Sequence, residues 1–234
     1  MEYDILGDDF QAVEFSLSPG EFVVAEPGAM IYKTEGIEMT AALGGGGNRG
    51  IIGSVLGAGK RMLTGESAFM TYWENAYNQK ETIAFSAPYP GKIVPIDLRY
   101  GEVVCQKDGF LCADADVAIS VFFQKKIMTA MFGGSGFIMQ KLSGTGTAFI
   151  SAGGFYKEVE LAEGERFQCD PACVLAFEPS VRFHLAGTGS LTGMMFGGEG
   201  VFFADFVGPG HVWVQSMPFG RFAAKAASVL HRGR

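Results

Sequence analysis

Apolar and polar residues alternate along much of this 234-residue chain with a period of two. The alternation is clearest in "KIVPIDL" from Lys92, "YKEVEL" from Tyr156 and "RFHLAG" from Arg182, and each segment adjoins a turn rich in Gly or Pro. Because successive side chains of a strand point to opposite faces, this period predicts short strands. The 34 Gly residues allow many tight turns. The sequence therefore predicts an all-β, antiparallel fold with few short helices.

The pattern also repeats along the chain. The segment "LSPGEFVVAEPGAMIYKTEG" from Leu17 shares its skeleton with "LRYGEVVCQKDGFLCADADV" from Leu98 and "LAEGERFQCDPACVLAFEPS" from Leu161. A second set of three similar segments follows, "TGESAFMTYWEN", "GGSGFIMQKLSG" and "GGEGVFFADFVG", each leading into a further apolar strand. We therefore expect one body of three β-sandwich repeats, 11–87, 92–152 and 155–217, related by a pseudo-threefold axis.

Helical spacing of apolar residues occurs in two segments and partly in a third. The segment "VFFQKKIMTAMF", Val121 to Phe132, has a one-faced helical pattern. In the tail, 218–234, the range Phe219 to Leu230 is predicted to be helical with its Arg and Lys side chains outward, because four apolar residues share one face: Phe222, Ala226, Val229 and Leu230. We also expect a short helix in the Gly-rich insert, 44–64, which only the first repeat contains.

The insert contains glycine patterns that resemble nucleotide-binding loops. A G-x-G-x-x-G pattern occurs at Gly45, Gly47 and Gly50, but the strand, helix and later acidic residue of a dinucleotide site are missing. We therefore expect no nucleotide there. Four apolar residues instead predict an interaction surface that packs on its own lobe, contacts a second copy or touches a membrane: Ile51, Ile52, Val55 and Leu56.

Charge is distributed unevenly, which restricts the classes of partner. The chain has a net charge of −7, but no acidic residue follows Asp205. The tail carries +4, from Arg221, Lys225, Arg232 and Arg234, which leaves −11 for the rest. An acidic body repels a phosphate backbone, so nucleic acid is not an expected partner. The basic tail is expected to contact its own body, an acidic face of a second copy, or anionic lipid.

The Gly-Glu pairs place a carboxylate at the same point of each repeat, at Glu21, Glu102 and Glu165. If a pseudo-threefold axis relates the repeats, these side chains could meet at it and hold a cation. The alternative is that each glutamate lies on a solvated turn.

Other chemistry finds little support in the sequence. The four cysteines lack zinc-site spacing and are expected to be buried, reduced thiols. There is no G-x-S-x-G elbow, and the chain has three histidines, His184, His211 and His231. We therefore expect no enzymatic activity and no cofactor. The sequence shows no signal-peptide pattern and no apolar run long enough to span a bilayer, so we expect a cytoplasmic protein, either free or peripheral to a membrane.

The repeated motifs resemble those of a known family. The segments "EPGAMIY", "GESAFM", "GSGFIMQKLSGTGTAFIS" and "GGEGVFFADFVGPGHVWVQSMPF" are similar to Aim24-like proteins, a family of bacterial proteins with mitochondrial relatives linked to biogenesis and inner-membrane organisation. The resemblance implies repeats of the unit of the tryptophan RNA-binding attenuation protein (TRAP) superfamily, a compact β-sandwich that builds symmetric oligomers. It implies no catalytic residues. TRAP binds RNA through repeated lysines, which the three repeats here do not share.

Two functional hypotheses follow from these observations. The first is a non-enzymatic scaffold or protein-interaction module, homo-oligomeric and associated with membrane organisation, that uses the insert or the tail as its surface. The alternative is a small-ligand or nucleic-acid binding protein that uses clefts between repeats, where aromatic residues such as Phe149 and Trp213 recur. Aromatic residues in strands more often belong to the core.

Overall fold

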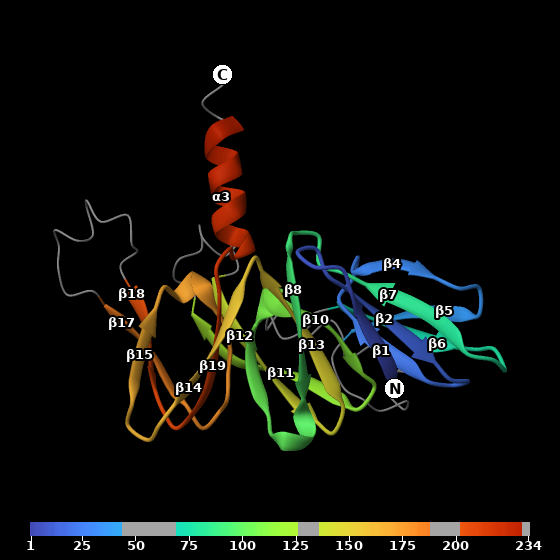
Figure 1. Ribbon diagram of the computed structural model, residues 1–234, viewed down its shortest axis with the longest axis horizontal. Coiled ribbons are helices and arrows are strands. Elements are labelled where there is room, and N and C mark those ends of the chain that lie inside the picture. Colours follow the sequence, from blue (N-terminus) through green and yellow to red (C-terminus); the bar gives the residue numbers. More distant parts are fainter. Residues whose placement is uncertain (44–68, 126–135, 188–201, 231–234) are drawn as a thin grey trace. The chain divides into compact units, whose positions relative to one another are not determined.

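The computed structural model describes residues 1–43, 69–125, 136–187 and 202–230. They form two compact units, residues 1–122 with 139–151, and residues 123–138 with 152–234. The described part of the chain consists mostly of antiparallel strands and contains one α-helix, α3 (Figure 1). This confirms the predicted all-β class. The insert, including Ile51, Ile52, Val55 and Leu56, lies outside the described residues, so its helix stays a prediction.

The first unit contains two complete sheets. One sheet has the order β1 (Glu2–Leu6), β2 (Ala12–Leu17), β7 (Glu81–Phe85), β4 (Met30–Lys33). The other has the order β5 (Ile37–Leu43), β6 (Phe69–Asn75), β3 (Phe22–Ala25), β10 (Phe110–Asp114), β13 (Thr147–Gly153), β8 (Gly91–Asp97).

Three further strands lie side by side in the order β11 (Val117–Lys125), β12 (Phe137–Gly144), β9 (Val103–Gln106). The boundary between the two units cuts through β11 and β12. Strand β11 corrects the predicted helix over Val121 to Phe132 for residues 121–125, which are extended, while residues 126–132 lie outside the described residues. In this strand Phe123 packs against the rings of Phe137 and Phe183, with centroids 6.1 and 5.6 Å apart.

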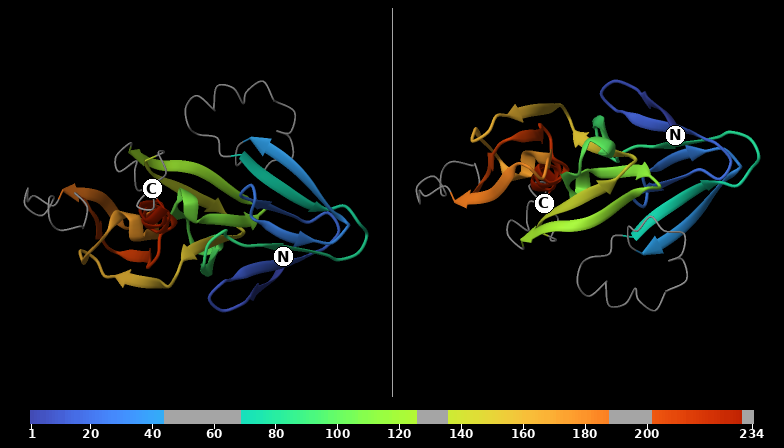
Figure 2. Two further views of the ribbon diagram at one scale, coloured as in Figure 1. Left: turned by 90° about the horizontal axis from the view of Figure 1, so that it is seen from above. Right: turned by 90° about the horizontal axis from the view of Figure 1, so that it is seen from below.

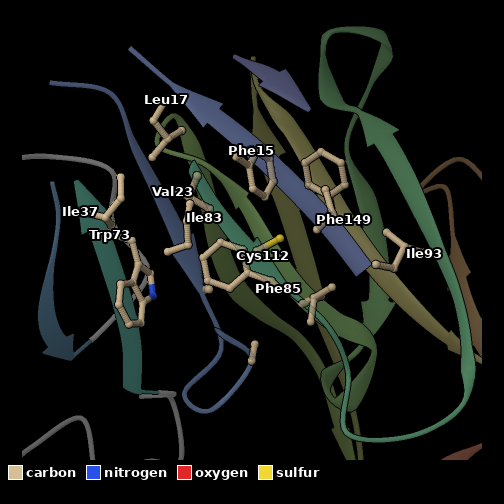
Figure 3. Packing of buried hydrophobic residues seen from close by; sticks show 14 residues of the cluster. Phe15, Leu17, Val23, Ile37, Trp73, Ile83, Phe85, Ile93, Cys112 and Phe149 are labelled. Atoms are coloured by element: carbon tan, nitrogen blue, oxygen red, sulfur yellow. The ribbon is translucent and has the colours of Figure 1, made fainter. Parts of the chain in front are cut away.

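The core of the first unit combines aliphatic side chains with the rings of Phe15, Trp73, Phe85 and Phe149 (Figure 3). Strand β2 buries every second residue, Val13, Phe15 and Leu17, which is the period-two pattern expected of a strand with one buried face. The Phe15 ring meets Phe149 edge to face, with centroids 5.1 Å apart. Such edge contacts suit the ring quadrupoles, and they hold β2 against β13.

The second unit has the same kind of construction on a smaller scale. Its strands lie in the orders β16 (Val174–Phe177), β19 (Gly210–Gln215), β14 (Tyr156–Leu161), and β15 (Arg166–Cys169), β18 (Phe202–Val207), β17 (Arg182–Gly187). Phe183 lies at the centre of its aromatic core, stacked on Phe177 and tilted against Phe206, with both centroids 5.2 Å away. The chain then enters α3 (Phe219–Leu230), which is seen end-on in both views of Figure 2.

Candidate functional site: helix α3 and its stem

Helix α3 is joined to the second unit by a short, well-bonded stem. The N–H groups of Ser216 and Met217 donate to the carbonyl oxygens of Phe155 and Gly153, at 2.8 and 3.0 Å. In the first turn of the helix, the N–H groups of Arg221 and Phe222 both donate to the Pro218 carbonyl. The stem therefore fixes where the helix begins.

Gly153 is needed for this close approach of two backbone segments. A Cβ atom at position 153 would lie 2.0 Å from the Met217 carbonyl oxygen. No side chain fits at that distance, so glycine is the residue that lets the stem cross here. The Gln215 side chain completes the joint by accepting the Gly153 N–H at 2.8 Å.

One basic side chain ties the helix to the strands. The Arg221 Nη1 atom lies 3.3 Å from Cys173 Sγ and 3.6 Å from Asp170 Oδ2. Asp170 is itself held in place, because its Oδ1 accepts the Ala172 N–H at 2.8 Å and caps a short 3₁₀ turn, Pro171–Cys173. Arg221, on the polar face of α3, thus contacts the strands of the second unit.

The aromatic face of α3 is exposed. Phe219 and Phe222 keep 45% and 49% of their surface in contact with solvent, and Ala226, on the same face, is exposed as well. Lys225 is also exposed and lies one turn after Arg221. In Figure 1 the helix stands out from the sheets of its unit. A surface helix usually buries its apolar face and exposes its polar face, so this arrangement makes α3 the strongest candidate for an interaction surface.

The sequence predicted the helix, with Arg221 and Lys225 on its outer face, but it did not indicate how the helix docks. Arg221 reaches back to the body instead of pointing only outward. The sequence did not identify Phe219 and Phe222 as part of an exposed surface. A usable signal was present, because Phe219 and Phe222 are large apolar residues at the start of a segment without acids.

The three repeated glutamates have local partners. Glu21 Oε2 accepts the N–H of Ser18 at 2.7 Å, and Glu165 Oε2 accepts the N–H of Ala162 at 2.9 Å, so each carboxylate closes its own turn. Glu102 differs, since it forms an ion pair with Lys141 at 3.1 Å. These contacts account for the three carboxylates without a shared cation. Across the described ranges, no group of three or more His, Cys, Asp or Glu side chains is placed to hold a metal ion.

Two histidines lie beside carboxylates, which the sequence could not show. His184 Nε2 lies 2.9 Å from Asp205 Oδ2, and Arg166 Nη2 lies 2.6 Å from the same oxygen. His211 lies between Glu158 and Glu178, at 3.6 and 3.3 Å. The Asp205 pair contains two parts of an acid-base site. Because Arg166 occupies the same carboxylate oxygen, however, the group is a cross-strand ion-pair network on β15, β17 and β18.

The cysteines are free thiols, as expected, but only two are buried. Burial raises the pKa of the Cys105 thiol to about 12, and it raises the pKa of the Cys112 thiol well above its ordinary value. Cys169 and Cys173 are partly exposed, which corrects the expectation of four buried thiols. Of the helical residues that the structure describes, none form a segment long and apolar enough to cross a membrane.

Three comparisons place the chain among known proteins. A family model described as Mitochondrial biogenesis AIM24 matches residues 3–217. An uncharacterised protein of Streptococcus pyogenes serotype M6 is 30% identical over 217 residues, which are 92% of this chain and 84% of that protein. The crystal structure of a protein from S. pyogenes is similar with a TM-score of 0.76 and 25% identity, over 97% of this chain and 99% of that one. Helix α3 begins after the range that the family model matches.

Proposed function

The chain belongs to the AIM24 family, and we propose that this member is a non-enzymatic scaffold whose helix α3 attaches it to the periphery of an anionic membrane. The proposal has two parts, a body of three TRAP-like repeats and a helix that binds lipid. The observation that carries it is the orientation of α3, whose polar side contacts the body while Phe219 and Phe222 face solvent.

The strand pairing supports three repeats of one unit. The six strands of each repeat are counted in chain order from β2, β8 and β14. In every repeat the first, sixth and third strands lie side by side, and so do the second, fifth and fourth. The two groups are β2–β7–β4 and β3–β6–β5, then β8–β13–β10 and β9–β12–β11, then β14–β19–β16 and β15–β18–β17. The third strand of each repeat also has a register shift near its start, at Met30, Phe110 and Val174. The proposal includes a pseudo-threefold arrangement of the three repeats.

The chemistry of α3 fits an interfacial helix. Such helices place aromatic residues at the boundary between headgroups and acyl chains and keep basic residues on the polar side. Arg221 and Lys225 are both within α3, and no acidic residue occurs after Asp205, so the helix itself contributes no repulsion from an anionic surface. The acidic remainder of the chain is repelled by the same surface, which favours attachment through the tail alone.

Sedimentation of the full chain with lipid vesicles tests this function. We expect pelleting with vesicles that contain phosphatidylserine, weaker pelleting with phosphatidylcholine alone, and a marked loss at about 0.5 M salt, where charges are screened within a few ångströms. The double variant Phe219→Ser, Phe222→Ser should remain in the supernatant. The matched control is Tyr100→Ser, which removes an aromatic ring that is 90% exposed elsewhere. Equal pelleting of both variants would show that α3 is not the membrane contact.

A further inference from the structure

Two cysteines flank the turn against which Arg221 docks. Cys169 is the last residue of β15, and Cys173 is the last residue before β16, so one turn separates the two thiols. The Cys173 N–H donates to the Asp170 carbonyl at 2.9 Å, and this hydrogen bond closes the turn. A turn of this kind brings its first and last Cα atoms within about 7 Å of each other. The chain therefore folds back on itself between the two thiols.

The corresponding turn of the first unit shows which way the two positions face. It joins β3 to β4 and is closed in the same way, because the Ala29 N–H donates to the Glu26 carbonyl at 3.2 Å. Ala25 and Ala29 occupy the positions of the two cysteines, and both are buried in one hydrophobic cluster. Two side chains that enter the same cluster lie on the same side of the turn. The same turn geometry places both thiols on one side of theirs.

The charge of one thiol acts on the other. Burial, then the negative charge of the Cys173 thiolate, and then that of Asp170 raise the pKa of the Cys169 thiol to about 12. Such a charge effect needs the two groups to be close together. If a neutral group is attached to the Cys173 sulfur, this second cause disappears and Cys169 ionises more readily.

Exposure separates this pair from the other cysteines. Cys105 and Cys112 are both 0% exposed, whereas Cys169 and Cys173 are partly exposed. A thiol must be accessible to react with a dissolved oxidant. The pair at the turn is therefore the one that such an oxidant can reach.

We propose that Cys169 and Cys173 form a redox modification site, and that their disulfide weakens the docking of α3. In the docked helix the Arg221 Nη1 atom lies 3.3 Å from the Cys173 sulfur. A disulfide sulfur carries no charge, and its bond to the second cysteine turns it away from the guanidinium. Oxidation therefore loosens the helix, and reduction restores the contact. The consequence for lipid rests on the proposed function, because a loosened α3 is then freer to bind an anionic membrane.

The oxidant is a low-molecular-weight disulfide such as oxidised glutathione, and the reaction is thiol–disulfide exchange. The Cys173 thiolate attacks one sulfur of the oxidant, the S–S bond of the oxidant breaks, and one thiolate leaves. The Cys169 thiolate then attacks the Cys173 sulfur and expels the second thiolate. The two leaving thiolates take up the two protons that the cysteines release. The protein thus loses two electrons and two protons, which convert the oxidant into two thiols.

The two equilibria are coupled in both directions. Loss of one hydrogen bond should raise the undocked fraction of α3 by about 2- to 10-fold. By reciprocity, anything that holds the helix away from the strands, an anionic vesicle included, should favour the disulfide by the same factor.

Mass spectrometry of the full chain in a glutathione redox buffer tests the site. We expect the wild type to lose the mass of two hydrogen atoms and to keep two of its four thiols, with the disulfide mapped to Cys169 and Cys173. Cys169→Ser lacks the second thiol, so it should stop at the mixed disulfide and gain one glutathionyl group. Cys173→Ser should stay unmodified. A wild type that keeps four thiols, or that stops at the mixed disulfide, would overturn the proposal.

Limited digestion with trypsin measures docking without lipid. Lys225 lies within α3, and cleavage after it requires local unfolding of the helix, which docking opposes. After glutathione is removed, the oxidised wild type should be cleaved at Lys225 about 2- to 10-fold faster than the reduced wild type. Cys173→Ser, treated in the same two ways, should show one rate. Equal rates for the oxidised and reduced wild type would overturn the coupling between the disulfide and α3.

Failure of the redox site can be told from failure of the proposed function. If oxidation leaves cleavage at Lys225 unchanged while the reduced chain still pellets with anionic vesicles, the redox site is wrong and the membrane role remains. If oxidation speeds cleavage but neither form pellets, the redox site is supported and the membrane role is wrong. Where both hold, the oxidised wild type should pellet at about 2- to 10-fold lower lipid concentration than the reduced form.

Discussion

Arg166 Nη2 lies 2.6 Å from Oδ2 of Asp205, joining an exposed guanidinium to a carboxylate that is almost fully buried. The Asp205 side chain is 1% exposed, and its second oxygen, Oδ1, has no hydrogen-bond partner among the residues that the structure describes. In the second repeat the corresponding cross-strand pair is Glu102 and Lys141, with the charges exchanged and both groups partly exposed. The same position in two repeats thus holds two ion pairs that differ in burial.

This difference predicts unequal effects of removing the basic partner. Arg166→Ala leaves the buried Asp205 carboxylate with His184 alone and should lower the free energy of unfolding by about 1–3 kcal/mol. Lys141→Ala leaves a carboxylate that solvent can reach, and it should cost about 0–1 kcal/mol. Urea unfolding of the two variants measures both values. Similar losses in the two variants would mean that burial of Asp205 does not decide the strength of its pair.

A second prediction concerns pH and Glu26, which follows β3. Burial, and secondly the nearby Asp108 carboxylate, raise the pKa of Glu26 to about 7 from an ordinary value of 4.5. A raised folded-state pKa means that the folded chain holds the proton more tightly than the unfolded chain. The contribution of Glu26 to stability is therefore fully present below pH 4.5 and is lost as pH rises to about 7.

The variant Glu26→Gln isolates this effect, because it keeps the size of the side chain and cannot ionise. At about pH 8 the variant should be more stable than the wild type by on the order of 1–2 kcal/mol, and near pH 5 the difference should shrink toward zero. Thermal unfolding at several pH values measures the difference. A gap between variant and wild type that stays constant with pH would contradict the raised pKa.

A third prediction tests the stem of α3. In Gly153→Ala the new Cβ would meet the Met217 carbonyl oxygen, so two backbone segments must move apart at a cost of about 1–3 kcal/mol. Gly187→Ala is a suitable control, since a Cβ there meets nothing within 4 Å. Calorimetry of both variants should show a lower melting temperature for Gly153→Ala alone. Equal melting temperatures would mean that the crossing at Gly153 is looser than described.

The strands were predictable from the sequence because alternation reports one buried face. The helix predicted from Val121 is wrong over residues 121–125 for a physical reason. Val117, Ile119, Val121 and Phe123 alternate with a period of two, as in a strand, and Phe123 packs on Phe137 and Phe183. A single sequence does not show which cross-strand neighbours are available. The tail helix was easier to predict, since its spacing fits only one period.

The repeated glutamates show a second limit of sequence comparison. Matching Gly-Glu pairs made Glu102 look equivalent to Glu21 and Glu165. In the structure, strand registers place Glu102 at the position of Arg166, because the turn after Leu98 is one residue shorter than the turn after Leu161. Glu102 thus matches Glu21 and Glu165 in the sequence pattern but occupies a different position in the structure.

The last prediction uses a cysteine as a reporter of how α3 docks. Burial raises the pKa of the Cys105 and Cys169 thiols to about 12 and raises that of Cys112 well above its ordinary value, so these three should react slowly with a thiol reagent in the folded chain. Cys173 is partly exposed and lies under the Arg221 guanidinium, 3.3 Å away. Its reaction rate should therefore report whether the helix is held against the strands.

Replacing Arg221 by alanine removes the contact of its guanidinium with Cys173 Sγ, so the labelling of one thiol per chain should become several-fold faster while the other three stay slow. Lys225→Ala, which removes an equal charge one turn along the helix, should leave the rate near that of the wild type. Labelling in Cys173→Ser identifies the fast thiol by its absence. Anionic vesicles should also accelerate Cys173 in the wild type if lipid draws α3 from the body, and an unchanged rate with vesicles would mean that the helix binds lipid while still docked.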